Sequence, residues 1–213
     1  LNALKNYIDT TKGALSLFDV PLHFRFYDAA TSNGGFDMRT IFDGTLTQDN
    51  PTRSVTFVDN HDTQPSQALQ SWIPDWFKPI AYALILLRAD GYPCIFYGDY
   101  YGIEHDNVQP KKDMLDCMLA ARKDRAYGKQ NDYFDHPDII GWTREGDEDH
   151  PDSGLAVVVT NKDGGTKHMY AGRAHAGETW YDCTGNRTEE VTVGEDGNGD
   201  FPVNGGSVSV WVK

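Results

Sequence analysis

The pattern of hydrophobic residues changes at Gly128, and this change constrains the fold more than any other feature of the sequence. Before Gly128, helical and strand patterns alternate along the chain. After it, helical periodicity disappears, and short strand-like segments follow one another between Gly, Asn and Asp turns. The sequence therefore predicts two domains of different class, at residues 1–128 and 129–213.

The first region has the pattern of an α/β arrangement. Apolar residues at positions 1, 4, 7 and 8 predict a helix, and two more are expected at residues 75–89 and about 111–125. Apolar runs at 15–20, 55–58 and 94–97 predict strands, and Asp37 can cap a short helix that contains Met38. Short apolar strands separated by helices are typical of a parallel sheet covered on both faces.

The second region predicts an antiparallel β-sandwich. Seven segments have strand character and are separated by turn residues: IIGWTRE, GLAVVVTN, KHMYAG, TWYDCTG, EEVTV, GDFPV and SVSVWVK. The predicted fold class is thus α/β plus all-β.

Charge and hydropathy exclude two classes of partner. The formal net charge is −13, from 19 basic and 32 acidic residues, whereas a nucleic-acid partner requires a basic surface. A neutral substrate such as a carbohydrate is not repelled, although the acidity can also serve solubility alone. No run of about 18 apolar residues exists, so no membrane-spanning helix is expected.

Three cysteines, Cys94, Cys117 and Cys183, are widely spaced in the sequence. An odd number without a CxxC pair suggests neither a disulfide framework nor a metal site. We expect isolated thiols that serve packing.

The segment VTFVDNHDTQ, residues 55–64, contains the first candidate for chemistry. An apolar strand runs directly into Asp59, Asn60, His61 and Asp62. Functional side chains gather at the carboxyl ends of parallel strands, and a carboxylate beside an imidazole can stabilise a cation, hold sugar hydroxyls or act as a base. Such residues also cap helices or have a purely structural role, and the residues themselves do not distinguish this structural interpretation from the chemical one. Strand alternation places Asp59 on the side opposite Asp62.

Several segments resemble the alpha-amylase family of retaining glycoside hydrolases, in particular its bacterial liquefying branch. They are FVDNHDTQ, DVPLHF and GYPCIFYGDYYG, with further similarity in GGFDMR, DYFDHPDIIGWTREGD, AGETWYD and NGGSVSVWV. The similarity covers essentially the whole chain. It implies a (β/α)8 TIM barrel followed by a β-sandwich domain, in which residues 1–128 supply barrel strands six to eight and residues 129–213 form the sandwich.

The resemblance also assigns roles at the end of the central strand. It implies that Asp62 is the third catalytic carboxylate, which grips hydroxyls of the distorted sugar, and that Asn60, His61 and Gln64 bind substrate. The motifs that carry the family's nucleophilic Asp and acid Glu are absent from this sequence. Asp19 and Asp99 are poor substitutes, because Asp19 precedes a proline turn and neither belongs to those motifs. We therefore expect the isolated chain to be inactive.

The function implied is the hydrolysis of internal α-1,4-glucosidic bonds of starch or maltooligosaccharides, with retention. The opening LNALKNYI, without Met or a signal peptide, predicts a fragment or processed chain whose N-terminal part lies upstream or on a companion chain. The alternative is a carbohydrate-binding or structural module. The family implies secretion, and a cytoplasmic location is also compatible.

A calcium site follows from the resemblance as well. The matching positions are Gly34, Phe36, Pro137, Asp138 and Asn161, and an asparagine where relatives carry aspartate weakens such a site. The alternative is a shared turn without metal. Among the aromatic residues, Tyr100 and Tyr101 are expected at the rim of a sugar site, whereas Trp76 is expected to pack in the core.

Overall fold

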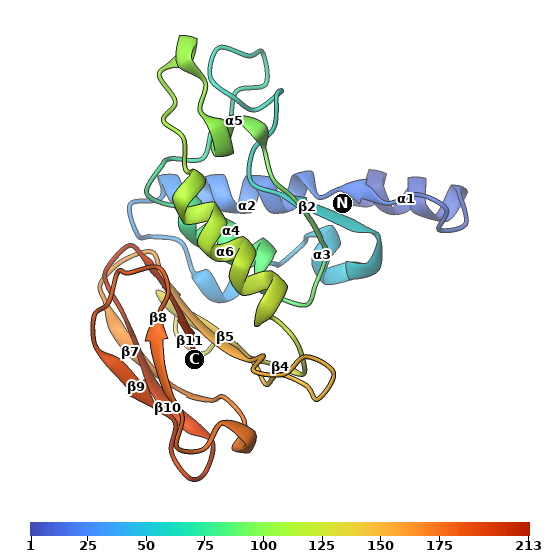
Figure 1. Cartoon of the computed structure of the whole chain (residues 1–213). Coiled ribbons are helices and arrows are strands. Elements are labelled where there is room, and N and C mark those ends of the chain that lie inside the picture. Colours follow the sequence, from blue (N-terminus) through green and yellow to red (C-terminus); the bar gives the residue numbers. More distant parts are fainter.

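A computed structural model describes the whole chain, residues 1–213, and shows a helical part resting on a layer of antiparallel strands (Figure 1). The helices of the N-terminal part are α1 (Asn2–Thr10), α2 (Val20–Thr31), α3 (Leu46–Asp49), α4 (Lys78–Leu86), α5 (Tyr97–Tyr101) and α6 (Lys112–Asp124). Its strands are β1 (Leu17–Phe18), β2 (Ser54–Phe57) and β3 (Tyr92–Cys94). Three 3-10 turns lie at Met38–Thr40, Pro51–Arg53 and Glu104–Asp106.

The three strands of this part form one parallel sheet in the order β1-β2-β3, as the apolar runs predict. The connection from β2 to β3 passes through α4, which is buried on nearly every side. Pro79 lies in the first turn of α4, where a missing amide hydrogen costs nothing.

Some predicted boundaries were wrong. The helix expected at 75–89 begins only at Lys78, because residues 74–77 form a turn. The strand expected at 94–97 ends at Cys94, and the carbonyl of Phe96 instead accepts the amides of Asp99 and Tyr100 as α5 begins. The helix after Asp37 is only a 3-10 turn, although the Asp37 carboxylate caps it as predicted through the amide of Arg39.

The C-terminal part is an antiparallel β-sandwich, as predicted. Six strands form one sheet in the order β4-β5-β6-β11-β8-β9, and two form another, β10-β7. Their bounds are β4 (Gln130–Tyr133), β5 (Ile139–Arg144), β6 (Leu155–Thr160), β7 (Gly165–Tyr170), β8 (Thr179–Asp182), β9 (Glu190–Thr192), β10 (Asn198–Val203) and β11 (Val208–Val212). A 3-10 turn lies at Arg173–His175. All seven predicted segments contain a strand, and β4 is an additional one.

The central strands β5, β6 and β11 of the six-stranded sheet are buried on both faces. In β6, Leu155, Val157 and Val159 belong to a core shared with the helical part, whereas Ala156 and Val158 belong to a second core within the sandwich. This alternation follows from the two-residue period of a strand. Because the first core contains residues of α2, α4 and α6, the two parts pack through one continuous apolar layer.

The change of class falls between α6 and β4, around Gly128. Gly128 has φ +76, and a Cβ there would lie 1.8 Å from the carbonyl oxygen of Gly146, so only glycine fits at this crossing. Whether residue 128 divides two separately folding domains stays a prediction. No helix of the molecule combines the length and the apolarity needed to cross a membrane.

Candidate functional site

The candidate site begins where β2 leaves the core. Phe57 and Val58 are buried, and the chain then turns outward through a turn built on the Asn60 side chain. Its Oδ1 atom accepts the amides of Asp62 at 2.9 Å and Thr63 at 3.1 Å. Such a turn is a common use of asparagine after a strand. It carries His61 and Asp62 away from the core.

His61 and Asp62 form an exposed pair at the carboxyl end of the central strand of the parallel sheet. The Nε2 atom of His61 lies 3.5 Å from Oδ1 of Asp62, and the two side chains are 84% and 56% exposed. Asn60 and Gln64 are half-buried beside them, and the amide of Gln64 donates to the carbonyl of Asn60. The structure thus brings the four residues predicted at this site into one turn.

Asp59 lies on the opposite side, in the protein interior, as strand alternation predicts. Its carboxylate accepts hydrogen bonds from the Thr63 hydroxyl at 2.7 Å, the Ile73 amide at 3.2 Å and the Lys78 ammonium at 2.7 Å. These donors fix the start of the loop that carries His61 and Asp62.

Lys78 connects Asp59 to a second buried carboxylate, Asp99. Its Nζ atom lies 2.5 Å from Oδ1 of Asp99, and the hydroxyl of Tyr82 donates to the other oxygen of Asp99 at 2.6 Å. The ammonium also lies 3.2 Å from the centroid of the Trp72 ring, a cation–π contact. This network joins the end of β2, the first turn of α4 and the start of α5. The sequence analysis did not predict this network, although the lysine inside the apolar run WFKPIAYALILL indicates a buried charge that needs partners.

The buried charges shift the acidity of their neighbours. Burial raises the pKa of Asp59 to about 6, although the charge of Lys78 and its hydrogen bond oppose this shift. Burial raises the pKa of Tyr82 above its ordinary value, and the charge of Asp99 adds to this effect. Tyr82 therefore remains a hydrogen-bond donor at neutral pH.

His23 of α2 supports the same strand end from another side. Its Nδ1 atom lies 2.7 Å from the carbonyl oxygen of Val58, its Nε2 atom lies 2.7 Å from the Ser71 hydroxyl, and its ring stacks on Phe57. Burial lowers the pKa of His23, so the ring is neutral at neutral pH. Its role is to position the loop.

Asp19 is a structural residue. Its buried carboxylate accepts the amides of Leu22, Leu46 and Thr47, at 3.1, 3.1 and 2.7 Å. It thereby caps α2 and α3 together, which agrees with the prediction that it serves a turn.

The five residues of the predicted calcium site meet where the helical part contacts the sandwich. The Asn161 amide nitrogen Nδ2 donates to the carbonyl of Phe36 at 2.9 Å, and its backbone amide donates to the carbonyl of Asp138 at 3.3 Å. A Cβ on Gly34 would lie 3.5 Å from the Asn161 carbonyl oxygen. The Pro137 carbonyl accepts the amide of Met38 at 2.7 Å.

This cluster consists mainly of uncharged oxygens. The Oδ1 atom of Asn161 is buried and has no hydrogen-bond partner, and Asp138 is the one carboxylate among the five residues. The Nζ atom of Lys162 lies 3.9 Å from that carboxylate. No group of three or more His, Cys, Asp or Glu side chains in the molecule is arranged to hold a metal ion. The buried unpartnered oxygen is the feature that fits a cation here.

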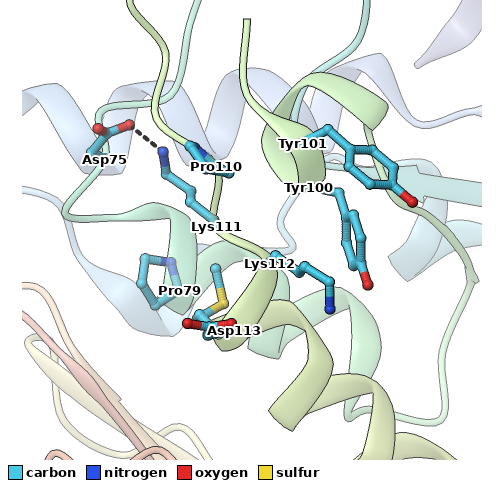
Figure 2. Close-up of a pocket in the computed structure, with 9 residues that line it drawn as sticks. Asp75, Pro79, Tyr100, Tyr101, Pro110, Lys111, Lys112 and Asp113 are labelled. Atoms are coloured by element: carbon cyan, nitrogen blue, oxygen red, sulfur yellow. Dashed lines mark ion pairs between the residues drawn. The ribbon is translucent and has the colours of Figure 1, made fainter.

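An open cavity of about 610 Å³ lies between α4, α5 and α6 (Figure 2). The Nζ atom of Lys111 lies 2.9 Å from Oδ1 of Asp75. Figure 2 shows this ion pair on one side of the cavity, with Tyr100 and Tyr101 on the other side. Tyr101 is 59% exposed, and the hydroxyl of Tyr100 donates to Asp116. Their place at the rim of a sugar site stays a prediction. Trp76 was wrongly placed in the core: it precedes α4 and is 39% exposed.

Comparisons with known proteins identify relatives of the chain. The family model for the alpha-amylase C-terminal domain matches residues 155–212. The whole chain is 60% identical to the alpha-amylase of Geobacillus stearothermophilus over 212 residues, and 56% identical to the glucan 1,4-alpha-maltohexaosidase of Bacillus sp. strain 707 over 213 residues. Over its whole length the chain is similar to members of the alpha-amylase family. It spans 39% and 41% of the lengths of these two relatives.

The fold has a solved counterpart in this family. The structure of an alpha-amylase I variant from Eisenia fetida, in complex with maltohexaose, matches 92% of this chain with a TM-score of 0.67. The match covers 48% of that chain at 15% sequence identity, so it supports the fold alone. The helical part and the sandwich therefore occur together in a longer member of the alpha-amylase family.

Proposed function

We propose that this chain is the C-terminal part of an endo-acting alpha-amylase, which hydrolyses internal α-1,4-glucosidic bonds of starch and related glucans with retention. The observation that carries the proposal is the exposed His61–Asp62 pair at the carboxyl end of β2. Similarity over the whole of this chain to a bacterial alpha-amylase and to a bacterial glucan 1,4-alpha-maltohexaosidase supports it.

In this proposal Asp62 acts on the sugar directly. Its carboxylate accepts hydrogen bonds from the hydroxyls of the sugar ring, and its negative charge stabilises the oxocarbenium-like transition state. His61, next to it, donates a hydrogen bond to the same ring, while Asn60 and Gln64 shape the turn and contact substrate. The nucleophile and the acid come from carboxylates outside this chain.

We further propose that β1, β2 and β3 are strands six to eight of a closed (β/α)8 barrel. Both outer strands of the sheet lack a neighbour on one side, and unpaired strand edges attract further strands. Large apolar side chains on these outer strands are exposed, Phe18 at 47% and Tyr92 at 75%, and so is Phe24 of α2 at 49%. Further barrel strands and helices would cover them.

A calcium ion at the contact between the two parts belongs to the same proposal. Carbonyl oxygens of Gly34, Phe36 and Pro137, the carboxylate of Asp138 and Oδ1 of Asn161 would hold it. Calcium favours such a set of oxygens, and the ion would supply structural cross-linking. Because Asn161 carries no charge, we expect weaker binding than with an aspartate at this position.

The purified chain tests the proposal directly. Incubated with starch, it should release no reducing sugar, because two of the three carboxylates of the mechanism are absent. Measurable hydrolysis by the chain alone would show that the assignment of roles is wrong.

The second candidate function is a carbohydrate-binding module, which the exposed aromatic rings favour. Tyr97 is 71% exposed, and its ring centroid lies 4.6 Å from that of Tyr101. Titration of the chain with maltohexaose separates the candidates. Loss of affinity in Asp62→Ala supports the barrel site, whereas unchanged affinity in this variant supports the module.

A further inference from the structure

Two of the three cysteines face each other, which corrects the expectation of isolated thiols. The Sγ atom of Cys117, on α6, lies 3.0 Å from the Sγ atom of Cys183, directly after β8. They are 66 positions apart in the sequence, and the spacing rules for cysteine motifs apply only to nearby residues. Cys94, the third thiol, lies on β3 and has no such neighbour.

Backbone hydrogen bonds hold both cysteines in place. Cys117 lies in the middle of the 13-residue helix α6, and its thiol also contacts the carbonyl of Cys183 at 3.1 Å. The amide of Cys183 donates to the carbonyl of Val210 at 2.9 Å, and the preceding carboxylate of Asp182 accepts the amide of Val210 at 2.9 Å. A disulfide bond measures about 2.05 Å, so bond formation requires an approach of roughly 1 Å between the sulfurs.

The pair is accessible from solvent. A cavity of about 390 Å³ opens over it, and its lining includes both cysteines together with Arg125 and Tyr181. Tyr181 is 51% exposed, so the cavity lies at the surface. A hydrogen bond from Cys183 lowers the pKa of the Cys117 thiol, and this same bond raises the pKa of Cys183. Cys117 is therefore the better first nucleophile.

We propose that Cys117 and Cys183 form a reversible disulfide that covalently joins the helical part to the β-sandwich. The co-reactant is a low-molecular-weight disulfide such as oxidised glutathione. The Cys117 thiolate attacks one sulfur of that disulfide, whose S–S bond breaks and releases one thiol that takes the Cys117 proton. The Cys183 thiolate then attacks Sγ of Cys117, which expels the second thiol with the Cys183 proton. Two protein thiols are oxidised, and one small disulfide is reduced to two thiols.

The bond would stabilise the contact between the two parts. It closes a long loop, and loops of this length give disulfides their larger stabilising effect, chiefly by restricting the unfolded chain. We expect a rise of about 5–10 °C in Tm on oxidation, lost again on addition of dithiothreitol. This inference does not depend on the proposed function.

The test treats the purified full chain with oxidised glutathione and counts free thiols. The count should fall from three to one, and tryptic peptides under non-reducing conditions should contain Cys117 joined to Cys183. Cys94→Ala is the matched control and should form the same bond with the same rise in Tm. Cys117→Ala and Cys183→Ala should show neither.

Three outcomes would overturn the proposal. They are retention of all three thiols, glutathione remaining attached to Cys117 without a cross-link, and a cross-link that includes Cys94. Repeating the oxidation in urea shows whether the folded structure, rather than the reactivity of the individual thiols, selects the cysteines that pair. If the folded structure directs the pairing, the Cys117–Cys183 link should dominate only in the folded protein.

Discussion

Lys78 and Asp59 form an ion pair in which both side chains are completely excluded from solvent, with 2.7 Å between Nζ and Oδ2. The same ammonium contacts Asp99, so one positive charge serves two buried carboxylates. This arrangement fixes the base of the loop whose exposed side carries His61 and Asp62. The interior of the molecule, and not the exposed pair itself, therefore determines where the candidate carboxylate lies.

Replacing Lys78 should destabilise the protein strongly. Lys78→Met keeps most of the volume but leaves Asp59 and Asp99 without their counter-charge, which costs about 3–5 kcal/mol of unfolding free energy. Urea denaturation measures this loss of unfolding free energy. Lys112→Met is the matched control, because Lys112 pairs with Asp116 at the surface and its loss should change the unfolding free energy far less than Lys78→Met does. Equal stability of the two variants would contradict the proposed role of the buried pair.

Asp59 should make stability depend on pH in an unusual direction. Its pKa in the folded protein is about 6, above the ordinary value of 3.8, so the folded state binds the proton more tightly than the unfolded state. The stabilising contribution is complete below about pH 4 and is lost as the pH rises toward 6, by up to about 3 kcal/mol. Asp59→Asn removes the titration.

Urea denaturation of the wild type and of Asp59→Asn between pH 4 and pH 7 measures this contribution as a difference. The unfolding free energy of the wild type, relative to the variant, should decrease as pH rises. Asp28→Asn, which replaces an exposed aspartate on α2, serves as the control for the substitution itself. A difference for Asp59→Asn that is constant or increases with pH would contradict the raised pKa.

Calcium should stabilise the contact between the two parts, and the charge at position 161 should set the strength of the effect. We expect Asn161→Asp to increase the rise in Tm that CaCl2 produces over EGTA, because a carboxylate replaces the unpartnered amide oxygen. Asn161→Leu should abolish the rise. Asn186→Leu also removes a side-chain hydrogen bond to a backbone carbonyl, that of Val208, and should leave the calcium effect intact. Identical Tm values in CaCl2 and EGTA for both the wild type and Asn161→Asp would exclude the site.

Much of the fold could be predicted because its signals are local. The seven sandwich segments alternate side chains between two cores, and Val157 and Val158 of β6 illustrate why the pattern is readable from sequence. The start of α4 and the end of β3 could not be predicted from apolar runs, because backbone hydrogen bonds decide them: the Phe77 amide donates to the Pro74 carbonyl, and the amides of Asp99 and Tyr100 donate to the Phe96 carbonyl. Apolar periodicity carries no information on such bonds.

The candidate site was predicted only in part. The turn residues Asn60, His61 and Asp62 are adjacent in sequence, so one short segment identifies them. The residues that hold them, His23 and Lys78, are distant in sequence and meet the strand end only in the folded chain. The pairing of Cys117 with Cys183 could not be predicted from the sequence for the same reason.

The most direct test of the central claim is a chimera in which this chain replaces the matching segment of the Geobacillus stearothermophilus alpha-amylase. Starch hydrolysis by the chimera is measured with and without the substitution Asp62→Asn. The chimera should be active, because the two sequences are 60% identical over 212 residues. Asp62→Asn should lower kcat by about 10²- to 10³-fold, whereas the control Asp28→Asn should change it less than about twofold. An active chimera in which Asp62→Asn retains the control's kcat would contradict the claim that this chain supplies a catalytic carboxylate.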